Sequence, residues 1–435
     1  MAQFTGTPSS EMGESMSFFG WLDFSEEEQR QVRELMQLMS GRGTVDDLGI
    51  GTVRDAISNR LFPGTSTIQN RARYFLFVPW IYQRAESIRR VQLVARGEVY
   101  EKKLIEALRN GGDLEGLIGR QAGKDIKTLP SAIYWSGLAE YGIFLPAGLT
   151  LAQYGRAAAA GTPTQEDEGE LNVRSRSYWH RDMPAPPADL FEFTEANFDL
   201  TREESDWLGE RVLTTEMRTG PNLLSAYVRG LHKGEEISRE PFWDQPLPQD
   251  TDTGIRELVR HAEAFSRAMY GASVLYNLLL SKQRHSADMG DSERSEWLRD
   301  AMDGWIRDCS SKAIQTWSAD LGPFWKSVRL GSGSAGPTCR FVSAWCELVS
   351  SISSGNFNEM RASDLVRNRE LDHKRDQARF NNPDRMKAWN GSSGLAPLKY
   401  RWNTVWGFLA DLSDGLHGTQ IRSTWIQDSV GVADA

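Results

Sequence analysis

The sequence has few of the residues that most directly reveal chemistry. Its 435 residues include three cysteines, which form neither a CxxC pair nor an even framework, and this usage is typical of a reducing compartment. The six histidines are dispersed and show no metal-ligand spacing. The GxxxxGK[ST] loop of phosphate-binding NTPases does not occur. We therefore expect neither a metal nor a cofactor.

Long apolar runs are also missing. Runs such as 74–81 are far shorter than the roughly 20 residues that a membrane-spanning helix needs. The N-terminal segment lacks the order of basic, apolar and small residues that marks a signal peptide. These absences predict a soluble, cytoplasmic protein without a membrane partner.

Short matches to enzyme signatures occur without their context. His261-Ala-Glu263 is half of a zinc-deaminase signature, but the P-C-x-x-C half is absent. His180-Arg-Asp182 imitates a kinase catalytic loop, but no glycine-rich loop precedes it. Glu101-Lys-Lys103 fits the E-x-K part of many nucleases, yet it falls in a helical pattern with no upstream aspartate on a strand. The sequence therefore favours a non-enzymatic protein, with a nuclease of unreadable motif as an alternative.

Helical periodicity is abundant. Residues 253–282 carry a continuous apolar stripe, which corresponds to about 45 Å of helix. Capping boxes at 25–28 and 201–204 mark two helix starts. Period-two strand patterns are scarce, so the predicted fold class is mainly α and multi-helical. Most of the fifteen tryptophans are expected to be wedges between helices, because a buried indole covers a large area.

Composition suggests a division of the chain. Acidic residues and prolines cluster at 161–190, as is typical of an exposed connection. A larger C-terminal helical domain is expected after it, and an N-terminal helical domain, with a candidate helix-turn-helix or winged-helix unit, before it. The predicted segments are a flexible N-terminus at 1–19, the two domains at 20–160 and 191–412, the connection at 161–190 and a tail at 413–435.

Charge is unevenly distributed along the chain. The net charge is -9, which argues against affinity for nucleic acid over the whole surface. Residues 54–90, the first arginine island, hold seven Arg and two acidic residues, a local balance of +5. Residues 361–401, the second arginine island, hold ten basic and five acidic residues, again +5. Two basic islands therefore lie in an acidic body.

The first island contains a candidate DNA-reading motif. One helix is predicted from Thr52, a Phe62-Pro63-Gly64 break follows, and another helix is predicted from Ser66 or Thr67. On the polar side of that helix lie residues suited to base edges, Gln69, Asn70 and Arg73, and one suited to phosphate, Arg71. The alternative is an αα-hairpin whose arginines pair with the acidic body.

The second island combines a basic helix near 360–379 with the aromatic sequence Tyr400-Arg401-Trp402. Basic and aromatic side chains together suit phosphate binding and base stacking. The candidate nucleic-acid-binding residues here are Arg367, Arg375 and Arg401. The alternative is a solvated helix face on which acidic residues pair with the basic ones, and a Tyr-Arg-Trp that anchors packing.

Several blocks resemble a large bacterial family of unknown function. They are GWLDFSEEE at 20–28, LGIGTVRDA at 48–56, LFPGTSTIQNRARYF at 61–75, LPSAIYW at 129–135, WH at 179–180, YGASVLYN at 270–277 and YRW at 400–402. The resemblance covers nearly the whole chain and implies one architecture from about residue 18 to residue 412. It implies no catalytic residue, and it loosely associates the protein with mobile or antiviral-defence gene clusters.

These observations lead to a functional expectation. The protein is expected to be a non-enzymatic component of a bacterial DNA-transaction or antiviral-defence complex. Its islands would converge on one outward surface and hold nucleic acid phosphates or an acidic partner. The partners would be DNA and other subunits of that complex. A protein–protein scaffold without nucleic acid contact is the alternative.

Overall fold

The computed structural model describes residues 46–146, 148–160, 177–286, 292–330, 336–354 and 357–422. The predicted flexible terminus at 1–19, the capping box at 25–28 and most of the acidic part of 161–190 lie outside the described residues. So does the end of the predicted tail, beyond residue 422.

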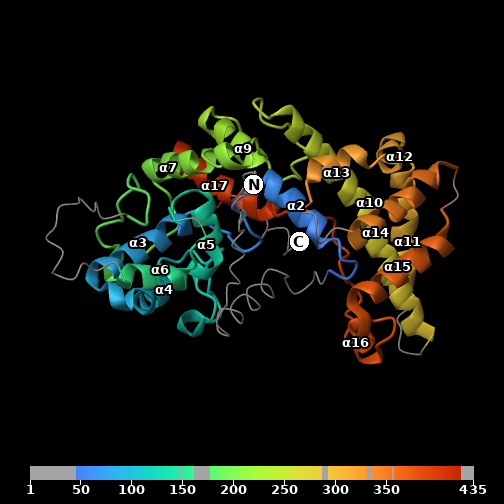
Figure 1. The fold of residues 1–435 in the computed structure, drawn as a ribbon, viewed down its shortest axis with the longest axis horizontal. Helices are drawn as coiled ribbons and strands as arrows, with labels where there is room; N and C mark the ends of the chain where they lie inside the picture. The colour runs from blue at the N-terminus through green and yellow to red at the C-terminus, as the bar shows by residue number, and fades with distance from the viewer. Residues whose placement is uncertain are drawn as a thin grey trace, which may run out of the picture.

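Two groups of helices lie at opposite ends of an elongated molecule (Figure 1). The first lobe contains α3 (Tyr74–Ile88), α4 (Leu93–Asn110), α5 (Pro130–Glu140), α6 (Leu151–Ala160) and α7 (Arg202–Leu213). The second lobe contains α10 (Thr253–Ser286), α11 (Ser292–Cys309), α12 (Lys312–Ala319), α14 (Gly336–Ser350), α15 (Glu359–Lys374) and α16 (Pro383–Lys387).

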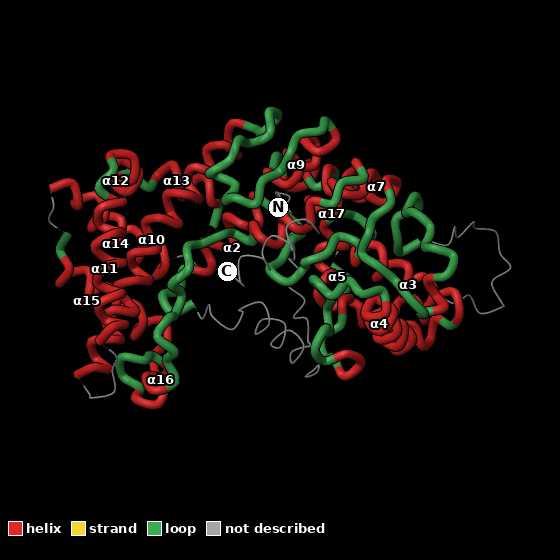
Figure 2. The backbone as a smooth tube through the Cα atoms, turned by 180° about the vertical axis from the view of Figure 1, so that it is seen from behind, coloured by secondary structure: helices red, strands yellow, loops and turns green. Residues whose placement is uncertain are grey.

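Further helices join the two lobes. Between them lie α2 (Gly51–Leu61), α9 (Leu223–His232), α13 (Gly322–Val328) and α17 (Trp402–His417). The short helix α8 (Glu216–Thr219) precedes α9 in the chain. Helix α2 contacts α10 and α13 on one side and α9 on the other. Short 3-10 turns occur at Arg90–Gln92, Gly123–Asp125, Leu190–Glu192, Ser351–Ser354 and Arg375–Gln377. From behind, a long loop runs from α16 towards α2 (Figure 2).

The mainly α, multi-helical class is confirmed. In the part of the chain that the structure describes, extended pairing is limited to an isolated antiparallel bridge between Phe144 and Trp179. The long predicted helix over 253–282 is α10, and the helix predicted from Thr52 is α2. The capping box before α7 is present, because the Thr201 hydroxyl accepts from the Glu204 amide and the Glu204 carboxylate accepts from the Thr201 amide.

The helix predicted from Ser66 or Thr67 is wrong. The chain is irregular over 62–73, and α3 begins only at Tyr74. Distant side chains satisfy the backbone here: the Arg71 amide donates to the Tyr134 hydroxyl (3.2 Å), and the Ala72 amide donates to Asp411 (2.7 Å). A backbone amide that is paired in this way does not need a helix. The predicted helix-turn-helix across 53–78 is therefore not confirmed.

Aromatic side chains hold the centre together. Trp402 packs against Phe62, Phe242 and Tyr227, with ring centroids 5.2–5.8 Å apart. Its indole also donates to the Glu240 carbonyl (2.7 Å). The predicted role of tryptophan as a wedge is confirmed for the almost fully buried Trp80, Trp179, Trp345 and Trp402. One apolar core consequently runs through both lobes.

Candidate functional site

The irregular segment buries most of the polar residues predicted to read DNA. Gln69 is 2% exposed, and its amide donates to the Ile133 carbonyl (3.1 Å). Asn70 is half-buried. Neither residue lies on a helix, so they do not form the polar face that the sequence predicted.

Arg71 belongs to a buried ion-pair cluster. Its guanidinium contacts Asp113 (2.7 Å) and Asp411 (3.3 Å), and Asp411 also contacts Arg422 (3.2 Å). Burial lowers the pKa of Arg71, but Asp411 and Asp113 outweigh it and hold the pKa above its ordinary value. This arginine is therefore an internal tie between the start of α3 and α17.

Arg73 is used in the same way. It is 6% exposed, and it contacts Glu204 (3.0 Å) at the first turn of α7. Its guanidinium also donates to the side chain (2.7 Å) and the backbone carbonyl (3.1 Å) of Asn197. The sequence alternative in which arginines of the first island pair with the acidic body describes Arg71 and Arg73 correctly.

Arg367 and Arg401, predicted in the second island, also make internal contacts. Arg367 lies over the Phe380 ring, 4.7 Å from its centroid. Arg401 donates to Asn59 (2.8 Å) and to the Thr65 carbonyl (2.8 Å). Burial lowers the pKa of Arg401, against a smaller opposing effect of Asp55. Tyr400 and Trp402 beside it are buried, so this sequence anchors packing.

Arg375 is the predicted residue that reaches an open groove. It is exposed directly after α15, and its φ of 50° lies where side chains other than glycine are rare. The expectation that the two islands converge on one outward surface is therefore wrong: Arg71 and Arg73 are neutralised internally in the first lobe, whereas Arg375 lies in the second.

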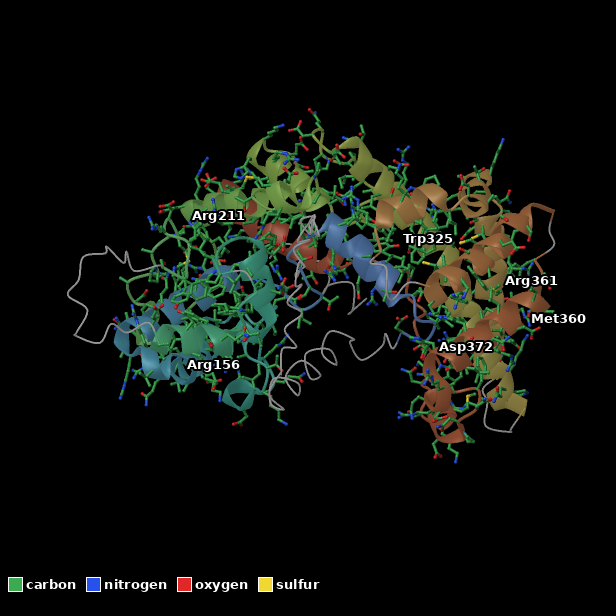
Figure 3. All side chains as sticks on the ribbon, viewed as in Figure 1. Arg156, Arg211, Trp325, Met360, Arg361 and Asp372 are labelled. Atoms are coloured by element: carbon green, nitrogen blue, oxygen red, sulfur yellow. The ribbon has the colours of Figure 1, made fainter. Side chains whose placement is uncertain are left out.

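The groove lies between the segment before α2, the start of α14 and α15. Its cavity volume is about 820 Å³. Asp372, in α15, is on the side of the second lobe that faces the rest of the molecule (Figure 3). The charged and polar groups along the groove include Asp46, Thr338, Arg340, Arg369, Asp372, His373 and Arg375.

Arg369 forms the charged floor of this groove. It is 7% exposed, and its guanidinium donates to the carbonyls of Leu48 (2.7 Å) and Gly49 (3.1 Å) and to the Thr338 hydroxyl (3.0 Å). All three acceptors are neutral. Burial lowers the pKa of Arg369; Asp46 and Asp372 act in the opposite direction, and Arg340 lowers it further.

Arg340 and Arg375 lie at the edge of the groove. Both are exposed, and within the described ranges neither they nor Arg369 form an ion pair with a carboxylate. By contrast, Lys374 and Arg379, from the same island, both contact Asp47. The groove thus brings together three guanidinium groups that have no direct ion pair among the described residues, although Asp46 and Asp372 also line it.

Backbone geometry keeps the floor open. Gly49 has φ +62°, and a Cβ at this position would be 2.4 Å from Nη2 of Arg369 and 2.9 Å from the His373 ring. Asp46 accepts from the amides of Ile50 and Gly51, both at 2.8 Å, and so caps α2. These contacts fix the segment that supplies the acceptors for Arg369.

Sequence reasoning placed Arg369 in the basic helix but did not select it, and it missed Arg340. Arg340 lies outside both islands, three residues after Pro337 at the start of a helix. This proline signals a helix start in the sequence, because proline favours the first helical turn. A basic residue one turn later would lie beside amides that have no partner within the helix.

The residues of the short enzyme-signature matches contact other side chains of the fold. Glu101 is 0% exposed and accepts from the Ser131 amide (2.6 Å), the Ser131 hydroxyl (2.8 Å) and the Tyr82 hydroxyl (3.0 Å). Burial raises the pKa of Glu101 to about 7. His180 contacts Arg211 (2.7 Å), and His261 accepts from the Trp317 indole (2.9 Å). Glu101 therefore ties α4 to the start of α5.

The described residues contain no group of three or more His, Cys, Asp or Glu side chains arranged to hold a metal ion. None of the helices in these parts of the chain combines the length and the apolar character needed to cross a membrane.

Comparison with known proteins finds a family whose model matches most of this chain. Neither a curated protein nor a solved structure matches the chain. A family model matches residues 16–416, which is most of the sequence and both lobes. The chain belongs to this family, DUF6361, a family of unknown function.

Proposed function

We propose that this chain is a non-enzymatic binding component that holds nucleic acid phosphates in the groove between α2, α14 and α15. The observation that carries the proposal is the Arg369 guanidinium, which is buried at the floor with neutral oxygens as its partners. A buried guanidinium without a direct ion pair is costly. A phosphate that entered the groove would supply negative charge in direct contact with it through charge-assisted hydrogen bonds.

The edge of the groove supports the same function. Arg340 and Arg375 extend the positive charge from the floor to solvent. Pro337 and Thr338 belong to the first turn of α14, where the helix dipole favours anions. The resemblance of the sequence blocks to proteins of mobile and defence gene clusters supports a place for this binding in a DNA-transaction or antiviral-defence complex.

Binding to labelled single-stranded and duplex oligonucleotides at low salt tests the proposal. The wild-type protein should retain at least one probe and lose it steeply as salt rises. The double variant Arg340→Gln and Arg375→Gln should weaken binding and reduce the salt slope by about 1 for each lost phosphate contact. Arg202→Gln is the matched control, because that side chain is 78% exposed on α7, in the other lobe. No retention of either probe at low salt would contradict the function.

A protein–protein scaffold is the second candidate function. The internal pairing of Arg71 and Arg73 favours it, because these arginines are then structural and bind no nucleic acid. A scaffold should keep its assembly partners when Arg340 and Arg375 are replaced. Co-purification of partners with the double variant, compared with its retention on oligonucleotides, separates the two functions.

A further inference from the structure

We infer that the groove selects a terminal phosphate monoester, such as the phosphorylated end of a strand or a free nucleotide, over the internal phosphodiesters of a strand. The inference rests on the proposed function and names the ligand class for the same site. It follows from the burial of Arg369, the partners of its hydrogen bonds and the volume of the groove.

Arg369 cannot move out to meet a ligand. Its Nε and Nη2 atoms are held by the Leu48 and Gly49 carbonyls and the Thr338 hydroxyl at 2.7–3.1 Å. The side chain is 7% exposed. A phosphate must therefore enter the groove to reach it, and a terminal phosphate can do so because only one of its oxygens is attached to the rest of the ligand.

Arg369 also has donor capacity to spare. A guanidinium has five N–H donors, and within the described residues its Nη1 atom has no hydrogen-bond partner. The fixed Nε and Nη2 contacts use three donors and orient the group, so the two N–H groups of Nη1 remain for a phosphate with several free oxygens. Arg340 and Arg375, which also line the groove, add charge that can reach the same ligand.

The groove has the size and the charge for such a group. Its volume of about 820 Å³ is within the range of small-molecule sites, roughly 300–1,000 Å³. A phosphate monoester carries a charge of about -1.5 to -2 at neutral pH, more than a diester. Asp46, whose oxygens accept the amides of Ile50 and Gly51, also lines the groove, so its charge works against an anion there. Asp372 is exposed at the edge and should weaken binding.

The test compares matched ligands by fluorescence anisotropy and calorimetry on the full chain. One arm uses a 3′-labelled oligonucleotide with a 5′-phosphate against the same strand with a 5′-hydroxyl. The second arm uses adenosine monophosphate against adenosine. The phosphorylated member of a pair should bind about tenfold more tightly, since hydrogen bonds to charged groups contribute at least that much. Preference in the strand arm assigns the site to nucleic acid ends, and preference in the nucleotide arm alone assigns it to free nucleotides.

Substitutions of groove residues test whether the phosphorylated ligand binds in this groove. Arg340→Gln should lower the affinity for the phosphorylated ligand about tenfold, Asp372→Asn should raise it, and Arg202→Gln should leave it unchanged. Far-ultraviolet circular dichroism checks that each variant is folded. Equal affinity for both oligonucleotides, and for adenosine monophosphate and adenosine, would overturn the inference and leave the proposed function intact. No binding of any ligand at low salt would overturn both.

Discussion

The two arginine islands have the same charge in the sequence, but their candidate binding residues have different surroundings in the structure. In the first, Arg71 and Arg73 are buried against Asp113, Asp411 and Glu204. In the second, Arg369 has neutral acceptors, and Arg375 is exposed. The local balance is +5 in both segments. The charge of a segment therefore does not predict its surface charge, because the counter-charges come from elsewhere in the chain.

The partners of the arginines lie far away in the sequence, which explains why local sequence does not predict the difference between the islands. Asp411 lies 340 residues from Arg71, and it also accepts the amide of Ala72. Asp47 lies more than 320 residues from Lys374 and Arg379, which both contact it. Only the fold brings these carboxylates to the islands. Among the described residues, the same fold gives Arg340, Arg369 and Arg375 no carboxylate in a direct ion pair.

The largest predicted effect comes from removing a counter-charge of the first island. Asp411→Ala leaves Arg71 and Arg422 buried without their shared carboxylate, and we expect a loss of about 3–5 kcal/mol in the free energy of unfolding. The measurement is urea-induced unfolding followed by circular dichroism. Glu347→Ala is the control: its pair with Arg361 is exposed, so its loss should be below about 1 kcal/mol. Similar stabilities of the two variants would contradict an internal role for the first island.

A second prediction concerns the floor of the groove. Gly49→Ala places a Cβ against Arg369 in a backbone conformation with φ +62°, and we expect a loss of about 2 kcal/mol from strain together with the contact. Gly112→Ala is a matched control with φ +81° and open space around the added Cβ. The same unfolding measurement should show a smaller loss for Gly112→Ala. If Gly49→Ala costs no more than this control, Arg369 is not fixed by the segment before α2.

A third prediction contrasts Asp411 with a buried carboxylate that has only neutral partners. The pKa of Glu101 is raised to about 7, so the folded state keeps a proton that the unfolded state loses above its ordinary value near 4.5. The stability from this group is present below pH 4.5 and is lost as the pH rises to about 7. Glu101→Gln stays neutral, so at pH 8 it should be more stable than wild type by about 2 kcal/mol, with little difference near pH 5.

Unfolding at both pH values checks this sign. Glu106→Gln is a suitable control, because that carboxylate is 49% exposed on the same helix and should show almost no pH-dependent difference. A destabilised Glu101→Gln at pH 8 would mean that the charged carboxylate is the form that the fold prefers.

The smallest predicted effect is at Arg375. Its φ of 50° suits glycine, so Arg375→Gly should raise stability by about 0.5–1 kcal/mol, because the relief of backbone strain exceeds the cost of the freer unfolded chain. The same change should weaken phosphate binding. Thermal unfolding with and without adenosine monophosphate measures both quantities. A variant that is less stable, or that binds as well as wild type, would contradict a strained arginine retained for binding.

The helices could be predicted from sequence where local patterns decide them. The apolar stripe of α10 and the capping box of α7 lie within single segments and were predicted correctly. The segment 62–73 was not, because its backbone amides donate hydrogen bonds to Tyr134 and Asp411 instead of forming a helix. These partners give no signal in the local periodicity.

The candidate site was predicted only in part, for the same reason. Arg375 was selected for its basic neighbours, and it does line the groove. Arg71 and Arg73 were selected by the same criterion and are buried. Arg340 was missed because it lies outside both islands, and the importance of Arg369 depends on Leu48, Gly49 and Thr338, which are distant in sequence.

The most direct test of the contrast between the islands is arginine footprinting on the native protein. Phenylglyoxal modification, followed by mass spectrometry, reports how accessible each guanidinium is without any substitution. Arg340 and Arg375 should react rapidly and be protected by adenosine monophosphate, while Arg71 and Arg73 should stay unmodified until the protein unfolds. Reaction of Arg71 and Arg73 as fast as Arg340 would contradict the account.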